Sequence, residues 1–372
     1  MILILTQCFP SRLGGIESLI SNLAINLGLE EKVIVFADTH NSKEDFNFDN
    51  KYKNIISVKR ISGIKLFRRR KKIKSMKLLI ESQKVDLVIC ESWKSIELAS
   101  DYLIKKQIPT ICLAHGNDIL SVNTNKIKRI KNSLNKSNLI VANSIYTKNL
   151  VENLINRNNN IDIIHPGAVD IRNIQSEKIK NISGKPLLLT LSRLEKRKGH
   201  VNIIYAIKKL VADFPDIQYV IAGTGIELYN LKELVFKLKL DKNILFVGNV
   251  NENQKKYLFS KTDLMIMPTI DETRNQSVEG FGISYIEAAF FGIPSIASNI
   301  GGTPEAVIHN VTGKIINNIE ELYFVIRELL MNKNLNNDLG AQAQQRAINE
   351  FTWDIITKKY ISLIHKLVNK IN

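Results

Sequence analysis

The stretch SVEGFGISYIEAAFFGIPSIASNIGGTPE, residues 277–305, predicts a ligand-binding loop followed by a helix. Gly280 and Gly282 free the backbone around Phe281, so amide N–H groups can turn toward an anion or a polar ligand. The apolar helix that follows would present its positive N-terminal end to the same ligand. Residues 295–297 read as a short buried strand, and a second glycine loop comes directly after it.

Two carboxylates accompany the first loop. Glu279 stands at its mouth, and Glu287 lies over a turn into the helix. A carboxylate can accept hydrogen bonds from the paired hydroxyls of a sugar or a ribose, whereas bare amides suit phosphate oxygens. A single glutamate in a helix is most often merely solvated. The interpretation, a polyol held near a phosphate, therefore rests on the whole arrangement.

The motifs of this stretch are EGFG at 279–282, Glu287 eight positions after Glu279, GIP at 292–294 and GGTPE at 301–305. Together they resemble the donor-site signature of retaining glycosyltransferases of family 4, especially the phosphatidylinositol-mannosyltransferase-type and surface-polysaccharide enzymes. The resemblance implies the GT-B fold, which consists of two Rossmann-like α/β domains with doubly wound parallel sheets facing a cleft. It is strongest over residues 186–313 and weak over residues 1–170.

The rest of the chain predicts two series of alternating strands and helices, as two such domains require. A chain of 372 residues exceeds the size at which a single core keeps growing. Buried strands are predicted at 2–6, 33–37, 85–90, 110–114, 139–142 and 161–164, and again at 186–191, 218–222, 245–247 and 264–267; helices are predicted at 18–29, 95–106 and 144–154.

The domain boundaries follow from a break in this alternation. Residues 171–185 are polar and read as a linker. The N-terminal, acceptor-binding domain is therefore expected at 1–170, and the C-terminal, nucleotide-sugar donor domain at 186–351. The resemblance implies that an amphipathic helix at 352–372 crosses back to the N-terminal domain.

A basic turn opens the second domain. Arg193 and Lys198 follow its first strand, five residues apart. A diphosphate leaving group needs positive charge that persists as the sugar bond breaks, and these two side chains could provide it without a metal. The chain has no Asp-x-Asp metal-ligand pair. A solvated basic turn is the alternative. The resemblance assigns both residues to the donor diphosphate, and we expect no cofactor and no metal.

The resemblance also assigns roles within the loop at 279–282 and to two other positions. Glu279 would contact the hydroxyls of the donor sugar and Glu287 the ribose, while Gly280, Phe281 and Gly282 would offer backbone amides to the phosphate. Gly223 begins a Gly-Thr-Gly loop that lacks the third glycine of a dinucleotide fingerprint, and the resemblance places this loop near the nucleotide base.

Two candidate positions lie in the first domain. Gly14 and Gly15 stand between the first strand and the first helix, the phosphate-facing order of a Rossmann half, and the resemblance has them face the donor phosphates and the acceptor. A plain turn before a helix is the alternative. His115 matches the family's histidine near the transferred sugar. It follows a parallel strand, where α/β ligands bind, and can donate or accept a hydrogen bond at neutral pH.

The positive charge of the chain is concentrated in one segment. Residues 51–80 carry twelve Lys or Arg and no Asp or Glu, within a chain of net charge +16. The part from 65 to 77 interleaves these with apolar residues and reads as an amphipathic basic helix or loop. Each Lys or Arg near an anionic leaflet contributes about 1 kcal/mol. We expect docking on anionic membranes that hold a lipid-linked acceptor, through the residues Arg68, Arg69, Arg70, Lys71 and Lys72. A solvated face and a nucleic-acid patch are the alternatives.

The cysteines and the N-terminus indicate a cytosolic location. Cys8, Cys90 and Cys112 have no metal-ligand spacing and read as buried free thiols in a reducing compartment. The first residues form too short an apolar run for a signal peptide, and no stretch approaches the length of a transmembrane helix. We expect a cytoplasmic protein attached peripherally to the inner face of the cell membrane.

These observations predict a retaining, metal-independent glycosyltransferase. It would move a sugar from a GDP- or UDP-linked donor to a hydroxyl of a glycan or glycolipid, in cell-surface polysaccharide or lipopolysaccharide synthesis. Another GT-B enzyme, such as a phosphorylase or an NDP-sugar epimerase, would need a cofactor lysine or hydrolysis machinery, for which the sequence offers no candidate. A basic-patch nucleic-acid-binding protein is the other alternative, but no recognition motif supports it, and we expect no nucleic acid.

Overall fold

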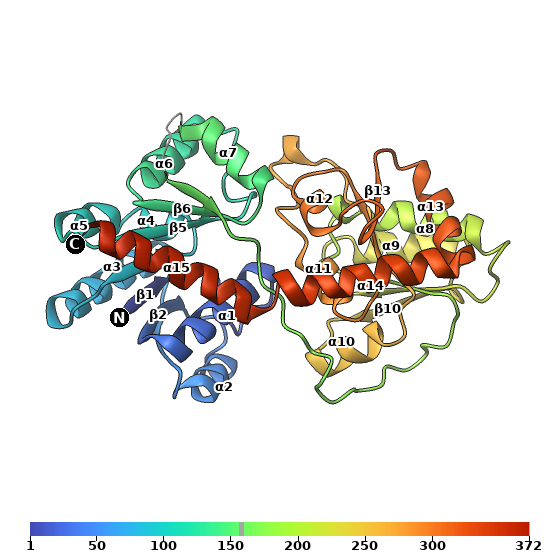
Figure 1. The fold of residues 1–372 in the computed structure, drawn as a ribbon, viewed down its shortest axis with the longest axis horizontal. Coiled ribbons are helices and arrows are strands. Elements are labelled where there is room, and N and C mark those ends of the chain that lie inside the picture. The colour runs from blue at the N-terminus through green and yellow to red at the C-terminus, as the bar shows by residue number, and fades with distance from the viewer. Residues whose placement is uncertain (156–159, 372) are drawn as a thin grey trace. The chain divides into compact units, whose positions relative to one another are not determined.

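The computed structural model describes residues 1–155 and 160–371 and divides into two compact α/β units (Figure 1). Unit 1 comprises Met1–Gly167 together with Trp353–Asn372, and unit 2 comprises Ala168–Thr352. Each unit is built on one sheet in which all strand pairs are parallel. The predicted fold class, two α/β domains with parallel sheets, is confirmed.

The sheet of unit 1 has seven strands in the order β3-β2-β1-β4-β5-β6-β7, so the strand order reverses between β1 and β4. Its strands are β1 (Ile2–Leu5), β2 (Val33–Asp38), β3 (Ile56–Ile61), β4 (Leu87–Cys90), β5 (Thr110–Ala114), β6 (Leu139–Ala142) and β7 (Ile161–Ile163). Its helices are α1 (Gly15–Glu30), α2 (Ser42–Tyr52), α3 (Lys65–Ser82), α4 (Trp93–Ile96), α5 (Ser100–Lys105), α6 (Thr124–Asn135), α7 (Ile145–Ile155) and α15 (Trp353–Ile371).

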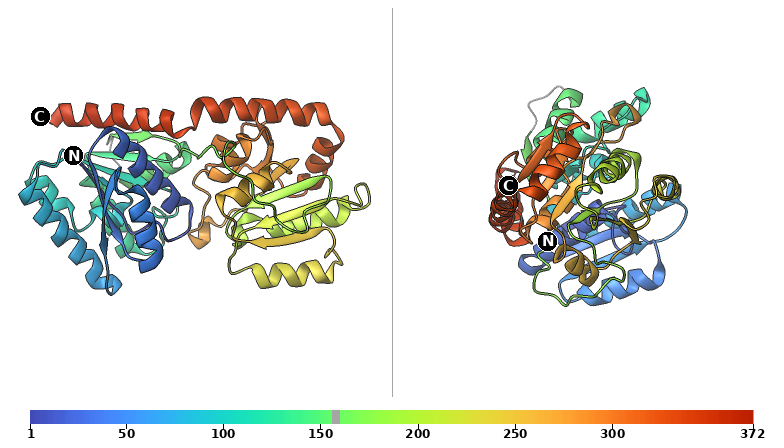
Figure 2. Two further views of the ribbon diagram at one scale, coloured as in Figure 1. Left: turned by 90° about the horizontal axis from the view of Figure 1, so that it is seen from below. Right: turned by 90° about the vertical axis from the view of Figure 1, so that its right-hand side faces the viewer.

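Helices cover both faces of this sheet, because successive strand residues point to opposite sides and both sides are apolar. Helices α1 and α15 pack on one face, and α3 to α7 pack on the other. Helix α15 buries Ile356, Tyr360, Ile364 and Leu367 at helical spacing, and Figure 2 shows it lying along the sheet of unit 1. The last helix of the chain therefore completes the core of the first unit.

The sheet of unit 2 has six strands in the order β10-β9-β8-β11-β12-β13. Its strands are β8 (Leu187–Leu191), β9 (Gln218–Ala222), β10 (Ile244–Gly248), β11 (Leu264–Met267), β12 (Ser295–Ser298) and β13 (Gly313–Ile316). Its helices are α8 (His200–Leu210), α9 (Leu228–Lys237), α10 (Glu252–Phe259), α11 (Ile283–Ala289), α12 (Thr303–Ala306), α13 (Glu321–Met331) and α14 (Lys333–Glu350), with 3-10 turns η1 (Lys196–Lys198) and η2 (Thr273–Asn275).

Unit 2 is layered in the same way. Helices α11 and α14 pack on one face of the sheet, and α8, α9 and α13 pack on the other. Ile171 is buried in the first of these cores, and Ile174, Ile179 and Ile182 pack against it. Residues 171–185, which the sequence suggested as a linker, thus contribute apolar side chains to unit 2.

The structure also differs from the sequence-based predictions at other points. Strand β3 was not predicted, because it lies at the edge of its sheet and alternates buried and more exposed residues, including Lys59 and Arg60. The helix predicted at 95–106 is divided into α4 and α5. All three cysteines are free, but Cys8 is only partly buried. None of the helices within the described residues is both long and apolar enough to span a bilayer.

Candidate functional site

The candidate site of unit 2 lies where β8, β11 and β12 end, because the carboxyl ends of parallel strands gather ligand-binding loops. The turn η1 follows β8 and ends at Gly199, whose φ is +73°. A Cβ atom at Gly199 would lie 2.1 Å from the carbonyl oxygen of Pro268, just after β11. Only glycine allows this close approach, which brings η1 against the end of the neighbouring strand.

The side chains of η1 form a buried charge cluster with Glu279. Both the Lys198 ammonium and the Arg197 guanidinium donate to Oε2 of Glu279. Arg197 and Lys198 are 6% and 7% exposed. Burial alone would raise the pKa of the Glu279 carboxyl, but the charges of Lys198 and Arg197 outweigh it and bring that pKa to about 2. Glu279 is therefore a carboxylate at neutral pH.

Arg193 takes a different position from Lys198. Its side chain is 62% exposed, and its Nη1 lies 2.8 Å from Oε1 of Glu195. The other oxygen of Glu195 lies 3.3 Å from Nε of Arg197, so Glu195 links the exposed arginine to the buried one. Three cations thus face two carboxylates. The cluster carries a surplus positive charge and suits an anionic ligand.

Sequence reasoning missed Arg197. The run Lys196-Arg197-Lys198 contains three adjacent cations, and spacing alone does not say which of them turn inward. In η1 the Lys196 side chain is 71% exposed and lies 3.5 Å from Glu272, whereas its two successors are buried. The apolar run of β11 was the only sequence signal that part of this turn would be buried. It does not say which of the three adjacent cations faces inward.

The loop at 279–282 is held by its own aromatic residue and by Tyr285. Phe281 is 2% exposed, and its ring lies 5.7 Å from that of Phe351. Gly282 has φ +102° and precedes α11, and a Cβ there would lie 2.6 Å from the ring of Tyr285. Tyr285 donates from its hydroxyl to the carbonyl of Met267, at 2.6 Å. Because the side chain of Phe281 is in the core, only its backbone could face a ligand.

The second glycine loop is joined to the first at Glu279. Gly301, with φ +62°, packs so closely that a Cβ would lie 2.3 Å from the carbonyl oxygen of Glu279. The amide of Gly302 donates to that same oxygen, at 2.9 Å. The backbone of Glu279 is thus fixed from the end of β12.

Glu287 lies on α11 and forms an ion pair that the sequence did not suggest. Its Oε1 lies 2.9 Å from Nζ of Lys255 on α10, which is also 2.9 Å from Glu252. Burial would lower the pKa of Lys255, but the carboxylates of Glu287 and Glu252 raise it well above its usual value. No sequence motif links α10 to α11, so Lys255 could not be predicted as the partner of Glu287 from the sequence.

The loop after β9 supports the turn that carries Arg193. Gly223 has φ +135°, and a Cβ there would lie 1.9 Å from the carbonyl oxygen of Ser192. The amide of Leu194 donates to the carbonyl of Thr224, at 2.9 Å. Gly223 is therefore required by close packing of two backbone segments.

A buried histidine lies behind the same turn. Nδ1 of His200 is 3.0 Å from the hydroxyl of Tyr219, which is 2.8 Å from the hydroxyl of Thr190, and Nε2 of His200 is 3.2 Å from Oγ of Ser192. Burial and the charge of Lys198 lower the pKa of His200 to about 4. A neutral imidazole thus connects the core of unit 2 to the residue before Arg193.

In unit 1, His115 follows β5 and is 8% exposed. Its Nε2 lies 2.8 Å from the carbonyl oxygen of Glu91, which can only accept, so Nε2 carries a proton. Its backbone amide donates to Oδ1 of Asp118, at 2.9 Å. Burial raises the pKa of Asp118, against the opposing influence of His115. The carbonyl of Glu91, just after β4, therefore holds the imidazole, and Asp118 holds the backbone of His115 just after β5.

The Gly14-Gly15 loop of unit 1 accommodates a buried carboxylate. A Cβ at Gly14 would lie 2.2 Å from Oε2 of Glu17, which is 5% exposed and pairs with Nε of Arg12 at 2.9 Å. No atom lies within 4 Å of a Cβ built at Gly15. A side chain at Gly14 would displace the flexible end of Glu17, whereas a Cβ at Gly15 would meet open space.

The basic segment forms helix α3, and its cations divide between two sides. Lys72 is buried, with Nζ 2.6 Å from Asp38, and Nε of Arg68 lies 2.9 Å from the same carboxylate. Arg69 pairs with Glu97 at 2.7 Å. The expectation that Lys72 faces a membrane is wrong, because its ammonium lies inside unit 1, and Arg68 and Arg69 are held by ion pairs.

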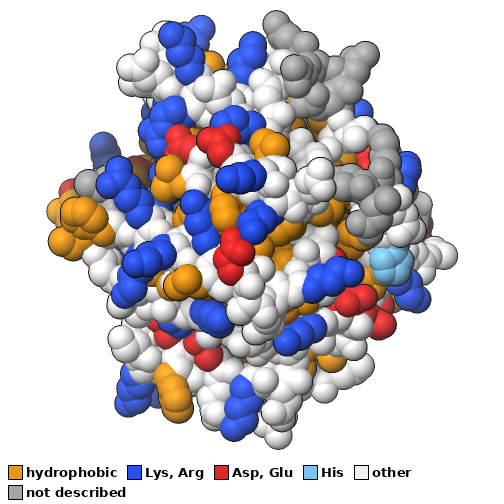
Figure 3. Space-filling model, turned by 90° about the vertical axis from the view of Figure 1, so that its left-hand side faces the viewer, with side chains coloured by type: hydrophobic (Ala, Val, Ile, Leu, Met, Phe, Trp, Pro, Cys, Tyr) orange, Lys and Arg blue, Asp and Glu red, His pale blue; other side chains and the backbone are white. Residues whose placement is uncertain are grey.

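Phe67, Arg70, Lys71, Lys74 and Leu78 lie on the outer face of α3 and are exposed, as are Lys77 and Glu81 beside them. These positions recur at three- and four-residue spacing and therefore share one side of the helix. Figure 3 looks onto the end of unit 1 and shows Lys and Arg side chains interspersed with hydrophobic ones. Among the described residues, no group of three or more His, Cys, Asp or Glu is placed to hold a metal ion.

The pKa of His200 makes the stability of unit 2 depend on pH. The unfolded chain binds a proton at this imidazole near pH 6.5, but the folded chain does so only near pH 4. The free energy of unfolding should thus lose roughly 3 kcal/mol as pH falls from 6.5 to 4, and none of this loss should occur above 6.5. Urea unfolding of the wild type and of His200→Gln across this range measures it. The variant should show a shallower loss, and identical pH slopes would contradict this account of His200.

Two family models match the chain. The model described as "Glycosyltransferase Family 4" matches residues 13–171, and the model described as "Glycosyl transferases group 1" matches residues 171–346. The first match lies almost entirely in unit 1, and the second lies in unit 2. Together they span both units, and the predicted family is confirmed.

Relatives and solved structures agree with this assignment. The chain is 22% identical over 373 residues to a GDP-mannose-dependent alpha-(1-6)-phosphatidylinositol monomannoside mannosyltransferase of Mycobacterium tuberculosis, covering 96% of both chains. It is 24% identical over 381 residues to the monoacylated-substrate counterpart of Corynebacterium glutamicum, covering 97% of both. The crystal structure of the Anabaena protein Alr3699/HepE with UDP and glucose superposes with a TM-score of 0.80 at 20% identity, covering 98% of this chain and 99% of that one.

This structural likeness confirms the predicted GT-B fold. The match to the family models likewise confirms the predicted enzyme class, a glycosyltransferase, and nothing in the comparisons favours the nucleic-acid or epimerase alternatives. The chain belongs to glycosyltransferase family 4, with a group 1 glycosyltransferase domain in its second unit.

Proposed function

We propose that this protein transfers a sugar from a nucleotide-sugar donor bound by unit 2 to a hydroxyl of a glycan or lipid-linked acceptor bound by unit 1. The transfer would retain the anomeric configuration, need no metal ion, and serve the synthesis of a cell-surface polysaccharide or glycolipid. The observation that carries the proposal is the buried cluster of Glu279, Arg197 and Lys198 between two glycine loops. The relatives named above use GDP-mannose, and the Anabaena structure holds UDP, so GDP- and UDP-linked sugars are the donors to consider.

The surplus charge of the cluster supports a diphosphate ligand. Lys198 and Arg197 are buried and preorganised, and Arg193 stands exposed beside them. Charge developing on the leaving diphosphate is stabilised by such fixed cations without any reorganisation. Lys198 would contact the diphosphate from inside the site and Arg193 from its solvent side. Arg197 joins Arg193 and Lys198, the two cations expected from the sequence, as a third positive charge near the diphosphate.

Glu279 would exchange partners when the donor binds. In this structure its carboxylate pairs with two buried cations, which would otherwise be costly to desolvate. A diphosphate can take over that role, because it brings its own negative charge to Lys198. The freed oxygens of Glu279 could then accept hydrogen bonds from the sugar hydroxyls, as a carboxylate does readily.

The remaining donor contacts follow from the backbone and from α11. Glu287 would accept hydrogen bonds from the ribose while Lys255 holds it in place. The backbone around Gly280, Phe281 and Gly282 would approach the phosphate, and the loop that begins at Gly223 would approach the base.

The chemistry we propose runs on one face of the sugar. The leaving diphosphate would accept the proton of the acceptor hydroxyl as the new glycosidic bond forms and the bond to the diphosphate breaks. His115 would orient a sugar hydroxyl, and Gly14 and Gly15 would allow close approach of the backbone in unit 1. Proton NMR of the anomeric signal in the isolated product tests this mechanism, since an inverted anomer would rule it out.

Removal of the Glu279 charge tests the partner exchange. Glu279→Gln removes the carboxylate paired with the buried Lys198 and leaves Arg197 with Glu195 alone, so the free energy of unfolding should fall by about 3 kcal/mol or more. A nucleoside diphosphate would replace the missing charge. The rise in melting temperature on adding UDP or GDP should therefore be larger for the variant than for the wild type. Glu233→Gln, at an exposed position on α9, is the control and should change neither quantity. An equal or smaller rise in Glu279→Gln would argue against the exchange.

A binding screen tests the donor site itself. Calorimetry and thermal unfolding with UDP, GDP and ADP, and with their sugars, should show one preferred nucleotide whose affinity is the same in EDTA. Arg193→Ala and Glu287→Ala should each weaken binding by about tenfold or more, since a hydrogen bond to a charged group contributes about 1.5–3 kcal/mol. Lys196→Ala removes a neighbouring charge that points away from the cluster and should leave binding unchanged. The proposal fails if no nucleotide binds, and salt-sensitive binding to nucleic acid would then favour the alternative function.

The outer face of α3 supports peripheral attachment to the inner face of the cell membrane. It places Arg70, Lys71 and Lys74 beside two exposed apolar side chains, Phe67 and Leu78. Lysine and arginine near an anionic leaflet contribute about 1 kcal/mol each, and the apolar side chains would insert at the interface. The named relatives act on phosphatidylinositol mannosides, which are membrane lipids. We therefore refine the expected membrane contact from Arg68–Lys72 to this outer face.

Vesicle co-sedimentation tests the membrane contact. The triple change Arg70→Gln, Lys71→Gln and Lys74→Gln should weaken binding to vesicles of phosphatidylcholine and phosphatidylglycerol by roughly a hundredfold, from three contributions of about 1 kcal/mol. The control is the triple change Lys237→Gln, Lys242→Gln and Lys261→Gln, which removes the same charge from exposed positions of unit 2. Equal losses of vesicle binding in both variants would show that only the net charge of the protein matters. No loss in the α3 variant would rule out the outer face of α3 as the membrane contact.

A further inference from the structure

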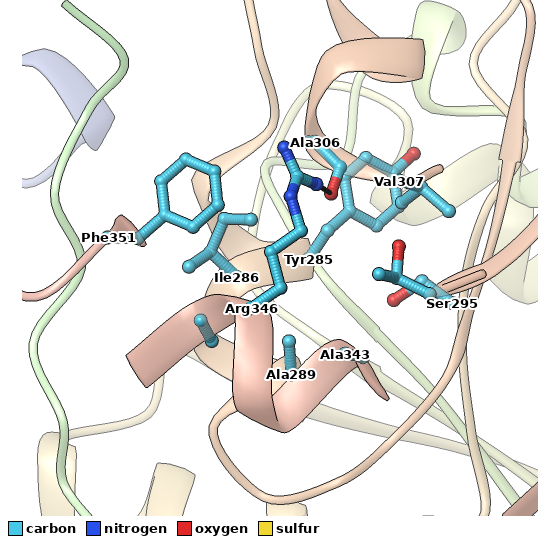
Figure 4. Close-up of a pocket in the computed structure, with 11 residues that line it drawn as sticks. Tyr285, Ile286, Ala289, Ser295, Ala306, Val307, Ala343, Arg346 and Phe351 are labelled. Atoms are coloured by element: carbon cyan, nitrogen blue, oxygen red, sulfur yellow. Dashed lines mark hydrogen bonds between the residues drawn. The ribbon is translucent and has the colours of Figure 1, made fainter. Parts of the chain in front are cut away.

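Arg346, on α14, contacts the second glycine loop from behind. Its Nη2 donates to the carbonyl of Glu305 at 2.8 Å, and its Nη1 donates to the carbonyl of Ala306 at 3.0 Å. Figure 4 draws the contact with Ala306. These two carbonyls lie at the C-terminal end of α12, where helix carbonyls have no partner within the helix. A guanidinium suits two adjacent acceptors because its N–H groups form a rigid planar fork. One side chain therefore fixes the end of the segment that begins with the glycine loop.

This segment in turn fixes the backbone of Glu279. The helix α12 starts directly after Gly302, whose amide donates to the carbonyl of Glu279 at 2.9 Å. Gly301 is in such close contact with the same carbonyl that no Cβ fits between them. A shift of α12 would therefore be transmitted to Glu279 through two backbone contacts.

The same guanidinium also braces the other side of the first loop. The central carbon of Arg346 lies 4.9 Å from the centroid of the Phe351 ring, in a cation–π arrangement. The Phe351 ring lies 5.7 Å from the ring of Phe281, and both rings are almost fully buried. Phe281 is two residues after Glu279. Contacts from Arg346 thus reach the loop at both of these residues, by independent routes.

Direct contact between Arg346 and a substrate is excluded on this side of α14. The cavity beside it has a volume of about 10 Å³ and is lined largely by apolar side chains, among them Tyr285, Ile286 and Ala289 (Figure 4). A volume of this size holds one water molecule at most. Arg346 is 14% exposed, and its remaining nitrogen, Nε, donates to Glu350 at 3.0 Å. Its polar contacts are therefore directed to the protein.

We propose that Arg346 is a positioning residue of the donor site. By holding the carbonyls of Glu305 and Ala306 and packing on Phe351, it sets the position of the Glu279 carboxylate. This inference rests on the proposed function in one respect, namely that Glu279 contacts the donor sugar. It adds a determinant of sugar binding and transfer that lies outside the motifs recognised in the sequence.

Amide hydrogen exchange tests the positioning without any ligand. In Arg346→Met, which keeps the length and much of the apolar stem, peptides covering 278–284 and 300–307 should exchange about tenfold faster than in the wild type. A peptide covering β9 should be unchanged. Glu350→Gln removes the ion-pair partner of Arg346 but leaves both carbonyl contacts in place, and it should match the wild type throughout. A uniform increase over unit 2, or no increase in the two loops, would overturn the proposal.

Donor binding provides the second readout. Arg346→Met should weaken binding of the preferred nucleotide sugar, tested with UDP-glucose and GDP-mannose, by about tenfold or more, because small displacements of a site residue are costly. Binding of the corresponding nucleoside diphosphate should weaken less than binding of the nucleotide sugar, since it loses only the backbone contacts of the loop at 280–282 and lacks the sugar that Glu279 would hold. Arg346→Lys keeps the charge but cannot reach both carbonyls, so its effect should be intermediate.

The two readouts separate the two ideas. If the wild type binds no nucleotide while the exchange result is as expected, the proposed function fails and the positioning role remains. If the wild type binds a donor normally and Arg346→Met binds nucleotide sugar and nucleoside diphosphate as the wild type does, the positioning role is contradicted. Equal losses for both ligands would also contradict it, because they would indicate a general loss of the site.

Discussion

The ion pairs of the Glu279 carboxylate with the buried Arg197 and Lys198 are the interaction that organises unit 2 around its site. Burying each of these ions alone would cost several kcal/mol, so the three are stable only as a cluster. Two close backbone contacts permit it, at Gly199 against Pro268 and at Gly301 against Glu279 itself. With Arg193 and Glu195 included, the cluster holds three cations and two carboxylates, and this surplus of positive charge suits an anionic ligand. On the proposed function a nucleoside diphosphate would satisfy that surplus, and this would be the physical link between the fold and glycosyl transfer.

The fold could be predicted closely where burial dominates the sequence pattern. Strands β5, β6, β9 and β11 match the predicted residues because both faces of these central strands are covered, which makes their sequences continuously apolar. Strand β3 could not be predicted in this way, because an edge strand tolerates Lys and Arg and so loses the apolar run. The role of α15 in the core of unit 1 required the family resemblance, since a helical pattern alone names no partner.

The site could be predicted only as far as motifs reach. The motifs and the family resemblance named Lys198 and Glu279 as candidates, but they could not show that the two form one ion cluster, or that Arg197 turns inward while Lys196 turns out. Contacts between elements distant in sequence leave no local pattern, so the pairing of Lys255 with Glu287 could not be predicted from the sequence either. A run of cations does not reveal orientation either, which is why Lys72 was wrongly expected at a membrane. The sequence supplied the residue types, and tertiary packing decided the side each faces.

The most direct measurement of the central claim is a crystal structure of the chain with UDP or GDP bound. The account predicts that an oxygen of the β-phosphate lies about 3 Å from Nζ of Lys198 and from a guanidinium nitrogen of Arg193. It also predicts that Lys198 no longer contacts Glu279, whose carboxylate then faces the side on which the sugar would lie. A diphosphate bound away from η1, or an unbroken Lys198–Glu279 pair beside a bound nucleotide, would contradict the account.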